Sequence, residues 1–175
     1  EQMDVTQGKI VIGMDLTLED IKQKYDAIVY NAILGGTANS KMFQEVREKA
    51  SLAYSAGSTY LRYKGNIFIK CGIEIKNYKK ALEIIRKQLK DMQNGIFTDE
   101  DIENAKKSII SGIRSIDDEQ DTEITYFFGQ ELTNEKISTE EYIKNIEKVA
   151  KDDIIKIANS LQINTIYFLK NKEEE

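Results

Sequence analysis

Residues 34–55 read LGGTANSKMFQEVREKASLAYS. A helix is expected to end at the start of this segment, and a strand is expected to begin near its end. Before this segment, apolar residues recur every three or four positions, which predicts a helix. These are Ile21, Tyr25, Ile28, Val29, Ala32 and Ile33. We expect Gly35-Gly36 to end this helix in a left-handed cap. Residues 40–50 then predict a second helix with Met42 and Val46 on its inner face, and residues 52–61 predict a strand.

The flanking sequence supplies further strands and helices with recognisable boundaries. Thr17 and Asp20 have the spacing of a capping box, which predicts a helix start at Thr17, and Thr98 and Asp101 repeat that spacing. Expected strands are residues 9–14, 67–75 and 165–169, with residues 52–61 and 67–75 forming an antiparallel hairpin around a turn at 64–66. Expected helices are residues 77–95 and 98–116, and two more beginning near residues 138 and 150.

This order of elements predicts an α+β fold, an antiparallel or mixed sheet with helices packed on one face. We expect one domain over residues 1–171 and a tail at 172–175. No apolar run approaches the roughly 20 residues needed to span a bilayer. Because the chain begins at Glu1, we expect it to be a domain cut from a longer protein. No export signal is visible, so we expect a cytoplasmic location.

Composition narrows the possible functions. The chain has 30 acidic and 25 basic side chains, a formal net charge of −5, which disfavours nucleic acid as a partner. It contains no histidine, which excludes Ser-His and Cys-His catalysis and the usual zinc ligand. The single cysteine, Cys71, lies in an apolar run and is expected to be a strand side chain rather than a nucleophile.

Two motif-like stretches have ordinary structural explanations. The acidic run at 117–123 resembles a calcium loop, but Thr122 stands where glycine is required and Phe128 where glutamate is required. A solvated helix face is the better interpretation. The glycine-rich residues 35–41 lack the complete phosphate-loop pattern, so a tight turn between two helices is favoured over phosphate binding.

Arg47 and Tyr54 form the candidate site. Arg47 falls near the end of the second expected helix, and Tyr54 opens the next strand. A chain reversal between them would bring a guanidinium and a phenol to one rim. These groups suit an extended peptide, because arginine donates to carbonyl oxygens and tyrosine donates to a developing oxyanion. Taken alone, however, a helix-end arginine and a strand tyrosine are more often structural.

The same residues carry a resemblance to a known family. Leu34-Gly35-Gly36, Ser40-Lys41-Met42-Phe43, Arg47-Glu48 and Leu52-Ala53-Tyr54 resemble the second domain of insulinase/pitrilysin zinc peptidases, whose pattern reads approximately L-G-G, S-x-L-F and R-E-x-x-x-L-A-Y. The resemblance implies the α+β metallohydrolase fold that this family shares with the mitochondrial processing peptidase. It also implies that Arg47 and Tyr54 contact the substrate backbone beside the scissile bond.

In this family a preceding domain carries H-x-x-E-H, which binds zinc and supplies the general base. This chain has no such motif, so we expect no metal and no catalytic residue in it. The resemblance therefore implies a non-catalytic, substrate-side domain that helps to close the cleavage chamber of a zinc endopeptidase. Its partners would be a peptide or unfolded substrate and a zinc-bearing upstream domain or partner subunit. The alternative is a structural, partner-binding domain of an inactive paralogue.

Overall fold

The computed structural model describes residues 1–18, 20, 22–62, 64–118, 120–133 and 136–172. The strands are β1 (Gln2–Met3), β2 (Gly8–Leu16), β3 (Ala53–Leu61), β4 (Asn66–Ile73) and β5 (Leu161–Asn171). The α-helices are α1 (Gln23–Asn31), α2 (Tyr78–Gln93), α3 (Asp99–Arg114), α4 (Gln120–Thr133), α5 (Thr139–Lys148) and α6 (Lys151–Ser160). The π-type helices are η1 (Ala32–Gly36) and η2 (Met42–Lys49), and the 3₁₀ turns are η3 (Ile75–Asn77) and η4 (Ile116–Asp118).

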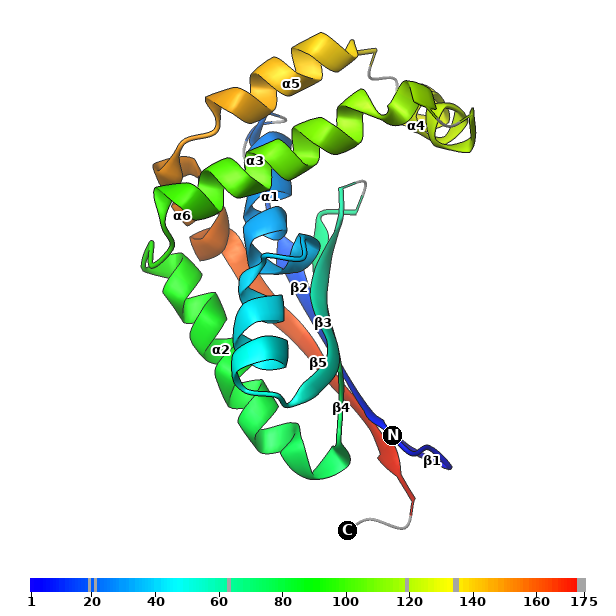
Figure 1. Cartoon of the computed structure of the whole chain (residues 1–175), viewed down its shortest axis with the longest axis vertical. Helices are drawn as coiled ribbons and strands as arrows, with labels where there is room; N and C mark the ends of the chain where they lie inside the picture. The colour runs from blue at the N-terminus through cyan, green and yellow to red at the C-terminus, as the bar shows by residue number, and fades with distance from the viewer. Residues whose placement is uncertain (19, 21, 63, 119, 134–135, 173–175) are drawn as a thin grey trace.

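The described strands form one mixed sheet in the order β1-β5-β2-β4-β3. β1 runs parallel to β5, and the remaining neighbours are antiparallel. The β3–β4 hairpin has its turn at Gly65, whose φ of +62° suits glycine. Figure 1 shows the helices on one side of this sheet, with the other side uncovered. The expected α+β class, with helices on one face, is confirmed.

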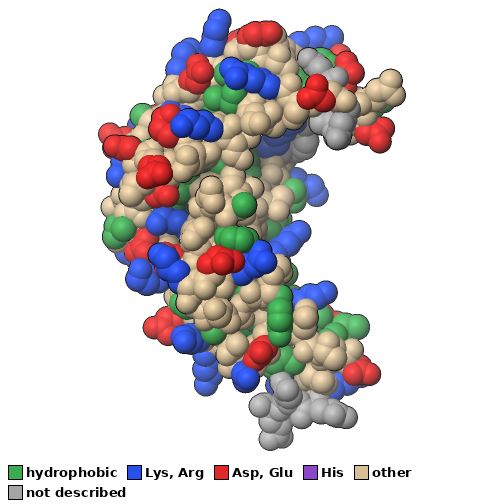
Figure 2. Space-filling model, viewed as in Figure 1, with side chains coloured by type: hydrophobic (Ala, Val, Ile, Leu, Met, Phe, Trp, Pro, Cys, Tyr) green, Lys and Arg blue, Asp and Glu red, His purple; other side chains and the backbone are tan. Residues whose placement is uncertain are grey.

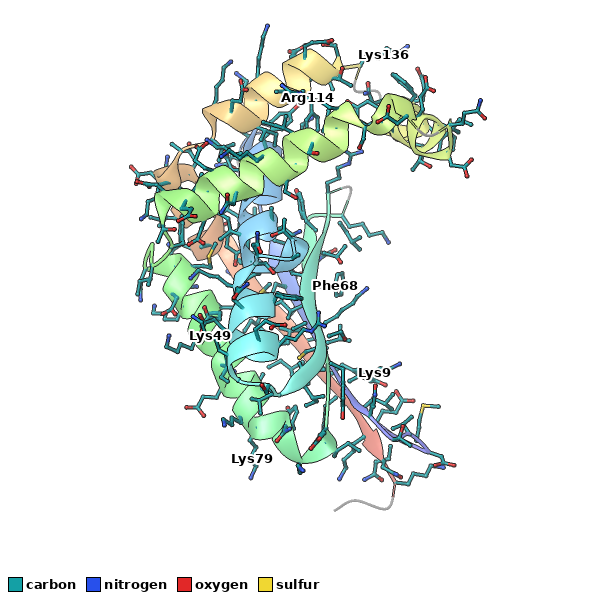
Figure 3. The ribbon with its side chains drawn as sticks, viewed as in Figure 1. Lys9, Lys49, Phe68, Lys79, Arg114 and Lys136 are labelled. Atoms are coloured by element: carbon teal, nitrogen blue, oxygen red, sulfur yellow. The ribbon has the colours of Figure 1, made fainter. Side chains whose placement is uncertain are left out.

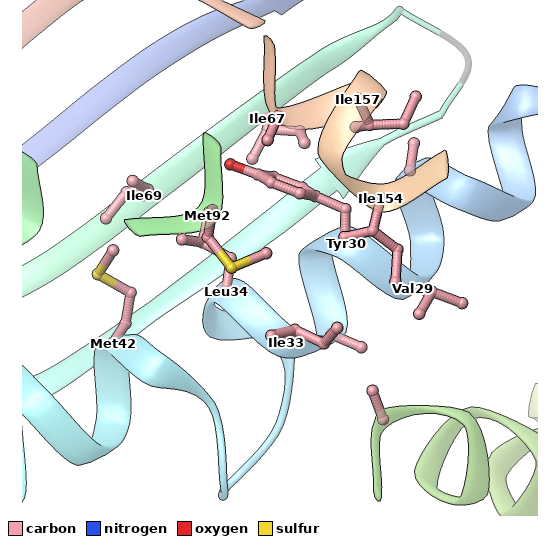
Figure 4. Packing of buried hydrophobic residues seen from close by; sticks show 14 of the residues in the cluster. Val29, Tyr30, Ile33, Leu34, Met42, Ile67, Ile69, Met92, Ile154 and Ile157 are labelled. Carbon is pink, nitrogen blue, oxygen red and sulfur yellow. The ribbon is translucent and has the colours of Figure 1, made fainter. Parts of the chain in front are cut away.

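The core lies between the sheet and the helices. Along β2 the side chains of Ile10, Ile12 and Met14 are buried, whereas Lys9 and Asp15 are exposed. This alternation identifies the helix-covered face. Figure 4 shows the same layer from the helix side, where Tyr30 and Leu34 of α1 and η1 meet residues of β4 and α2. Its labelled members include Met42, Ile67, Ile69 and Met92, which are fully buried.

The uncovered face of the sheet carries small, polar and scattered apolar side chains. Figure 3 shows Phe68 and Lys9 on this side, away from the helices. Gly13 lies opposite Phe68 in the register of β2 and β4, and a Cβ at Gly13 would stand 3.4 Å from the Phe68 ring. The ring therefore lies close over the neighbouring strand. No described helix covers this face of the sheet (Figure 1).

The helix start predicted at Thr17 is wrong. α1 begins at Gln23, and Thr17 lies in the preceding irregular segment. The start is organised instead by Asp20, whose Oδ1 accepts a hydrogen bond from Lys22 N at 2.9 Å. The chain needs residues beyond Leu16 to leave β2 before the helix can begin. Ile21, expected to begin the helical stripe, lies outside the described residues.

Gly35 does not form the left-handed cap predicted for it. The positive-φ glycines among the described residues are Gly65 and Gly95. Gly35 is required for close packing instead, because a Cβ there would stand 2.3 Å from Ser58 N of β3. Gly36 is less crowded, since its Cβ would meet the Asn31 side chain at 2.8 Å. The glycines thus let η1 approach the sheet.

The second capping box and the hairpin are confirmed. Thr98 Oγ1 accepts from Asp101 N at 3.0 Å, and Asp101 Oδ2 accepts from Thr98 N at 2.8 Å. β5 is longer than predicted, since it begins at Leu161 rather than Thr165, and β1 was not predicted. The single-domain boundary at 171 stays a prediction, and most of the expected tail, 173–175, lies outside the described residues.

The visible surface mixes charges of both signs. Figure 2 shows Lys and Arg interspersed with Asp and Glu over the face drawn there, on a molecule with a crescent outline. The exclusion of nucleic acid stays a prediction, because no partner is present. Within the described part of the chain, no helix is both long enough and apolar enough to cross a bilayer.

Candidate functional site

Arg47 is presented to solvent by the last turn of η2. The helix is fixed by Met42 and Val46, both fully buried on its inner side, so the Arg47 side points outward. The guanidinium lies over the Phe43 ring, 4.6 Å from its centroid, and its Nε is 3.7 Å from Glu48 Oε1. The side chain remains 45% exposed. These contacts are weak enough at a surface for a ligand to replace them.

A tight chain reversal follows Arg47. Ser51 has a φ of +51°, and Leu52 N donates to Val46 O at 3.2 Å across it. A left-handed residue is common just after a helix end, and here the buried Leu52 directly follows it. The reversal expected from the sequence is present, and it turns the chain from η2 directly into β3.

Tyr54 lies at an irregularity near the start of β3. Ala53 pairs with Ile73 and Ser55 pairs with Gly72, so Tyr54 is an extra residue between two paired positions. A bulge of this kind bends the strand and redirects the side chain. The Tyr54 side chain is 57% exposed, unusually high for a large aromatic residue.

Arg47 and Tyr54 line one hollow of about 370 Å³. Glu48 and Ser51 border it from the reversal, and Glu74 and Asn77 border it from the segment after β4. The hollow therefore offers guanidinium and amide donors, a phenol, and two carboxylates. This set of groups can hydrogen-bond an extended backbone and attract a cationic side chain. The structure brings the two predicted residues together, but their contact with substrate stays a prediction.

Sequence reasoning missed Glu74 and Asn77. The signal was strand pairing, because the antiparallel hairpin places Ala53 opposite Ile73. The residue after Ile73 must then lie beside the start of β3, which places Glu74 near Tyr54. Glu74 Oε2 is 2.8 Å from Lys76 Nζ, an exposed ion pair between near neighbours.

The part of the chain that the structure describes shows no group of side chains that could bind a metal ion. Within the described ranges, no three His, Cys, Asp or Glu side chains are grouped so that they could hold an ion. Cys71 is buried in β4, and burial raises the pKa of its thiol to about 11. A thiol with so high a pKa is a poor nucleophile and a poor ligand near neutral pH. The expectation of a strand side chain at Cys71 is confirmed.

Comparison with known proteins decides the family. Residues 1–109, well over half of the chain, match the family described as the peptidase M16 inactive domain. The chain belongs to this family. The resemblance of the 34–55 segment to the second, non-zinc domain of insulinase/pitrilysin peptidases is thereby confirmed.

Individual relatives of this M16 inactive domain agree with the assignment. One is the probable inactive metalloprotease YmfF of Bacillus subtilis, 38% identical over 99% of this chain and 41% of that protein. Another is the uncharacterized zinc protease YmxG of Bacillus subtilis, 34% identical over 49% of this chain and 21% of that protein. A solved structure of a conserved protein from Enterococcus faecalis V583 matches with a TM-score of 0.89 and 27% identity, covering 100% of this chain and 42% of that one.

The matched M16 relatives are much longer than this chain. It spans about two-fifths of YmfF and of the Enterococcus protein. The matched part is therefore less than half of each of those two proteins. Activity, substrates and partners of a whole protein of that size belong to the proposal below.

Proposed function

We propose that this M16 inactive domain is the substrate-side domain of a zinc endopeptidase that acts on peptides or unfolded proteins. In this proposal Arg47 donates hydrogen bonds to carbonyl oxygens of the peptide backbone beside the scissile bond. Tyr54 donates its phenol O–H to the oxygen on which negative charge develops. The chain itself cleaves nothing, and it helps to close the chamber around the peptide.

One observation carries the proposal, the shared hollow of Arg47 and Tyr54. A structural tyrosine is normally packed in the core. The Arg47–Glu48 ion pair, at 3.7 Å between two exposed side chains, contributes little to stability. Here both side chains are about half exposed, and a left-handed residue and a bulge direct them to one rim. Strained or irregular backbone that presents polar groups is typical of functional sites.

In this proposal the zinc ion is bound outside this chain. The residues of this chain do not fit a zinc site, so the proposal assigns the metal to an upstream domain or a partner subunit and derives no zinc step here. Cytoplasmic location is proposed with it.

A second candidate function is a partner-binding domain in an inactive paralogue. It is favoured by the name of the 38% identical relative, which describes a probable inactive metalloprotease. The retained Arg47 and Tyr54 favour the peptidase instead, because a purely structural domain has no need of an exposed pair. Under this alternative the same hollow would hold a segment of the partner.

Peptide hydrolysis by the full-length parent protein, together with any zinc-bearing partner subunit, tests the proposal. Tyr54→Phe should lower kcat/KM about a hundredfold, because a lost oxyanion donor typically costs this much. Arg47→Ala should lower it at least about tenfold, because a hydrogen bond from a charged donor contributes about 1.5 to 3 kcal/mol. The matched controls are Arg114→Ala and Tyr167→Phe, which lie outside the hollow. Rates within a factor of about two of the wild type in both site variants would remove the proposed roles. A complete assembly without hydrolytic activity would favour the inactive paralogue.

A further inference from the structure

A hollow of about 180 Å³ lies between α2 and the start of β5. Its apolar walls come from Met14 of β2, Leu89 of α2, and Leu161 and Ile163 of β5. Met14 is 1% exposed and Ile163 is 45% exposed, so the hollow runs from the core to the surface. Walls of this kind favour a hydrocarbon group over water.

Contacts between two helices fix the shape of this hollow. Gln93 of α2 lines it, and Gln93 Nε2 donates to Ala158 O of α6 at 3.4 Å. Asn159 Nδ2 of α6 donates to Gln93 O at 3.2 Å. These hydrogen bonds join α2 to α6, so the hollow is formed by packed helices and strands rather than by a loop. It is therefore preformed, as is usual for sites that bind small molecules.

The hydroxyl of Tyr30 is buried at this hollow without a partner. Tyr30 reaches the hollow from α1, and Figure 4 shows its ring extending away from that helix with the hydroxyl at the far end. The side chain is 1% exposed, and no described residue accepts a hydrogen bond from it. Burial raises the pKa of this phenol above its usual range, so the hydroxyl stays a neutral donor. Because buried hydroxyls are nearly always hydrogen-bonded, this one favours a ligand that brings an acceptor.

The charges at the hollow select a negatively charged ligand. Arg86 and Lys90 line it one helical turn apart on α2, and no Asp or Glu is among the described residues that line it. Arg86 forms no ion pair with a described residue, and Lys90 Nζ donates to the neutral Gln93 Oε1 at 3.4 Å. The neighbouring Asp91 pairs instead with Lys87 Nζ at 2.9 Å. Two like charges on one helix face repel each other, and an anion beside them would offset that repulsion.

We propose that this hollow binds a small carboxylic acid with a short apolar tail. The carboxylate accepts a hydrogen bond from the Tyr30 hydroxyl and pairs with Arg86 or Lys90, and the tail lies against the apolar walls. The volume is below the roughly 300 to 1,000 Å³ of sites for drug-sized ligands, which limits the tail to a few carbons. The hollow shares no lining residue with the Arg47–Tyr54 hollow, so the inference does not depend on the proposed function.

Saturation-transfer difference NMR with hexanoate tests this site on the full-length parent protein. Hexanoate has about eight non-hydrogen atoms, so a Kd of about 1 mM or tighter is expected. Hexylamine and 1-hexanol, which have the tail without the negative charge, should bind at least about tenfold more weakly. Acetate, which has the charge without the tail, should also bind at least about tenfold more weakly.

Two substitutions locate the bound hexanoate. Tyr30→Phe keeps the ring and removes the donor, and Arg86→Glu reverses one charge, so each should raise the Kd about tenfold or more. The matched controls, which should keep wild-type affinity, are Tyr60→Phe and Lys80→Glu. The first removes another buried hydroxyl that lacks a partner, and the second reverses an exposed charge on another face of α2. Without ligand, Tyr30→Phe should unfold at the wild-type temperature or above, because it removes an unpartnered hydroxyl.

Four results would overturn the proposal. Absence of saturable hexanoate binding would mean that the hollow takes up water only. Equal binding of hexylamine or 1-hexanol would show that the two basic side chains do not select the ligand. Wild-type hexanoate affinity in either Tyr30→Phe or Arg86→Glu would show that the acid is not held as described. Tighter binding of N-acetyl-leucine than of hexanoate would replace the free acid by the C-terminus of a peptide.

Discussion

The backbone conformation of individual residues positions Arg47 and Tyr54 more than contacts between their side chains do. Among the described residues, Ser51 is the one residue other than glycine that has a positive φ. It lies midway between Arg47 and Tyr54. Its conformation costs an L-residue roughly 1 kcal/mol or more, and the buried Leu52 next to it offsets this cost. The spacing of Arg47 and Tyr54 suggested a reversal, but no pattern in the sequence identified Ser51 as its left-handed residue.

Gly35 supplies a residue-scale prediction with an internal control. Gly35→Ala should lower the free energy of unfolding by about 3 kcal/mol, because its Cβ would stand 2.3 Å from the Ser58 backbone, which cannot yield. Gly112→Ala, in α3 with nothing within 4 Å of the new Cβ, should raise stability by up to about 1 kcal/mol. Urea unfolding of both variants measures this. Equal effects of the two substitutions would show that packing at Gly35 is not the constraint.

The same glycine shows what sequence reasoning can predict at this scale. Glycine after a helical stripe suggested a left-handed cap, since that is the commonest use of glycine at a helix end. The actual reason, contact with a strand more than twenty positions later, depends on tertiary packing. Arg47 and Tyr54 were found because their family pattern is local, whereas Glu74 entered the site through strand pairing.

At the scale of elements, α1 and α6 enclose a carboxylate. Asp26 of α1 is half-buried, and burial, followed by the nearby Asp153 carboxylate of α6, raises its pKa to about 6, although Lys156 opposes the shift. The folded form thus binds a proton more tightly than the unfolded chain, whose Asp pKa is 3.8. The stability that Asp26 contributes is complete below about pH 4 and is lost as the pH rises through about 6.

Asp26→Asn tests this contact between elements. The variant should be more stable than the wild type by about 1 kcal/mol at pH 7, a figure reduced for solvent screening at a half-buried group. The difference should shrink toward zero as the pH falls to about 4. Thermal unfolding at several pH values measures it. A constant difference across this range would mean that Asp26 does not titrate as described.

Elements with strong local signals were predicted best. The β3–β4 hairpin and the Thr98 capping box depend on residues within a few positions of each other, and both are present. The predicted start of α1 was wrong because the chain must first leave β2 after Leu16, a requirement that local capping preferences do not contain. β1 escaped prediction because its two residues depend entirely on pairing with β5 near the other end of the chain.

At the scale of the whole molecule, the M16 inactive domain has surfaces that suit additional polypeptide. One face of the sheet is uncovered, α4 carries exposed apolar side chains, and the Arg47–Tyr54 hollow lies at the start of β3. In the longer matched relatives, about three-fifths of the length lies outside the matched part. These features are consistent with a domain that contributes one wall of a peptide-binding chamber.

The central claim is that Arg47 and Tyr54 act together on one peptide. A double-mutant cycle on kcat/KM tests it, with Arg47→Ala, Tyr54→Phe and the double variant measured on the full-length parent protein, together with any zinc-bearing partner subunit, against one extended peptide. The account predicts that each single substitution lowers kcat/KM and that the double variant loses less than the two losses combined, with a coupling of about 0.5 kcal/mol or more. Wild-type kcat/KM in both single variants would contradict it.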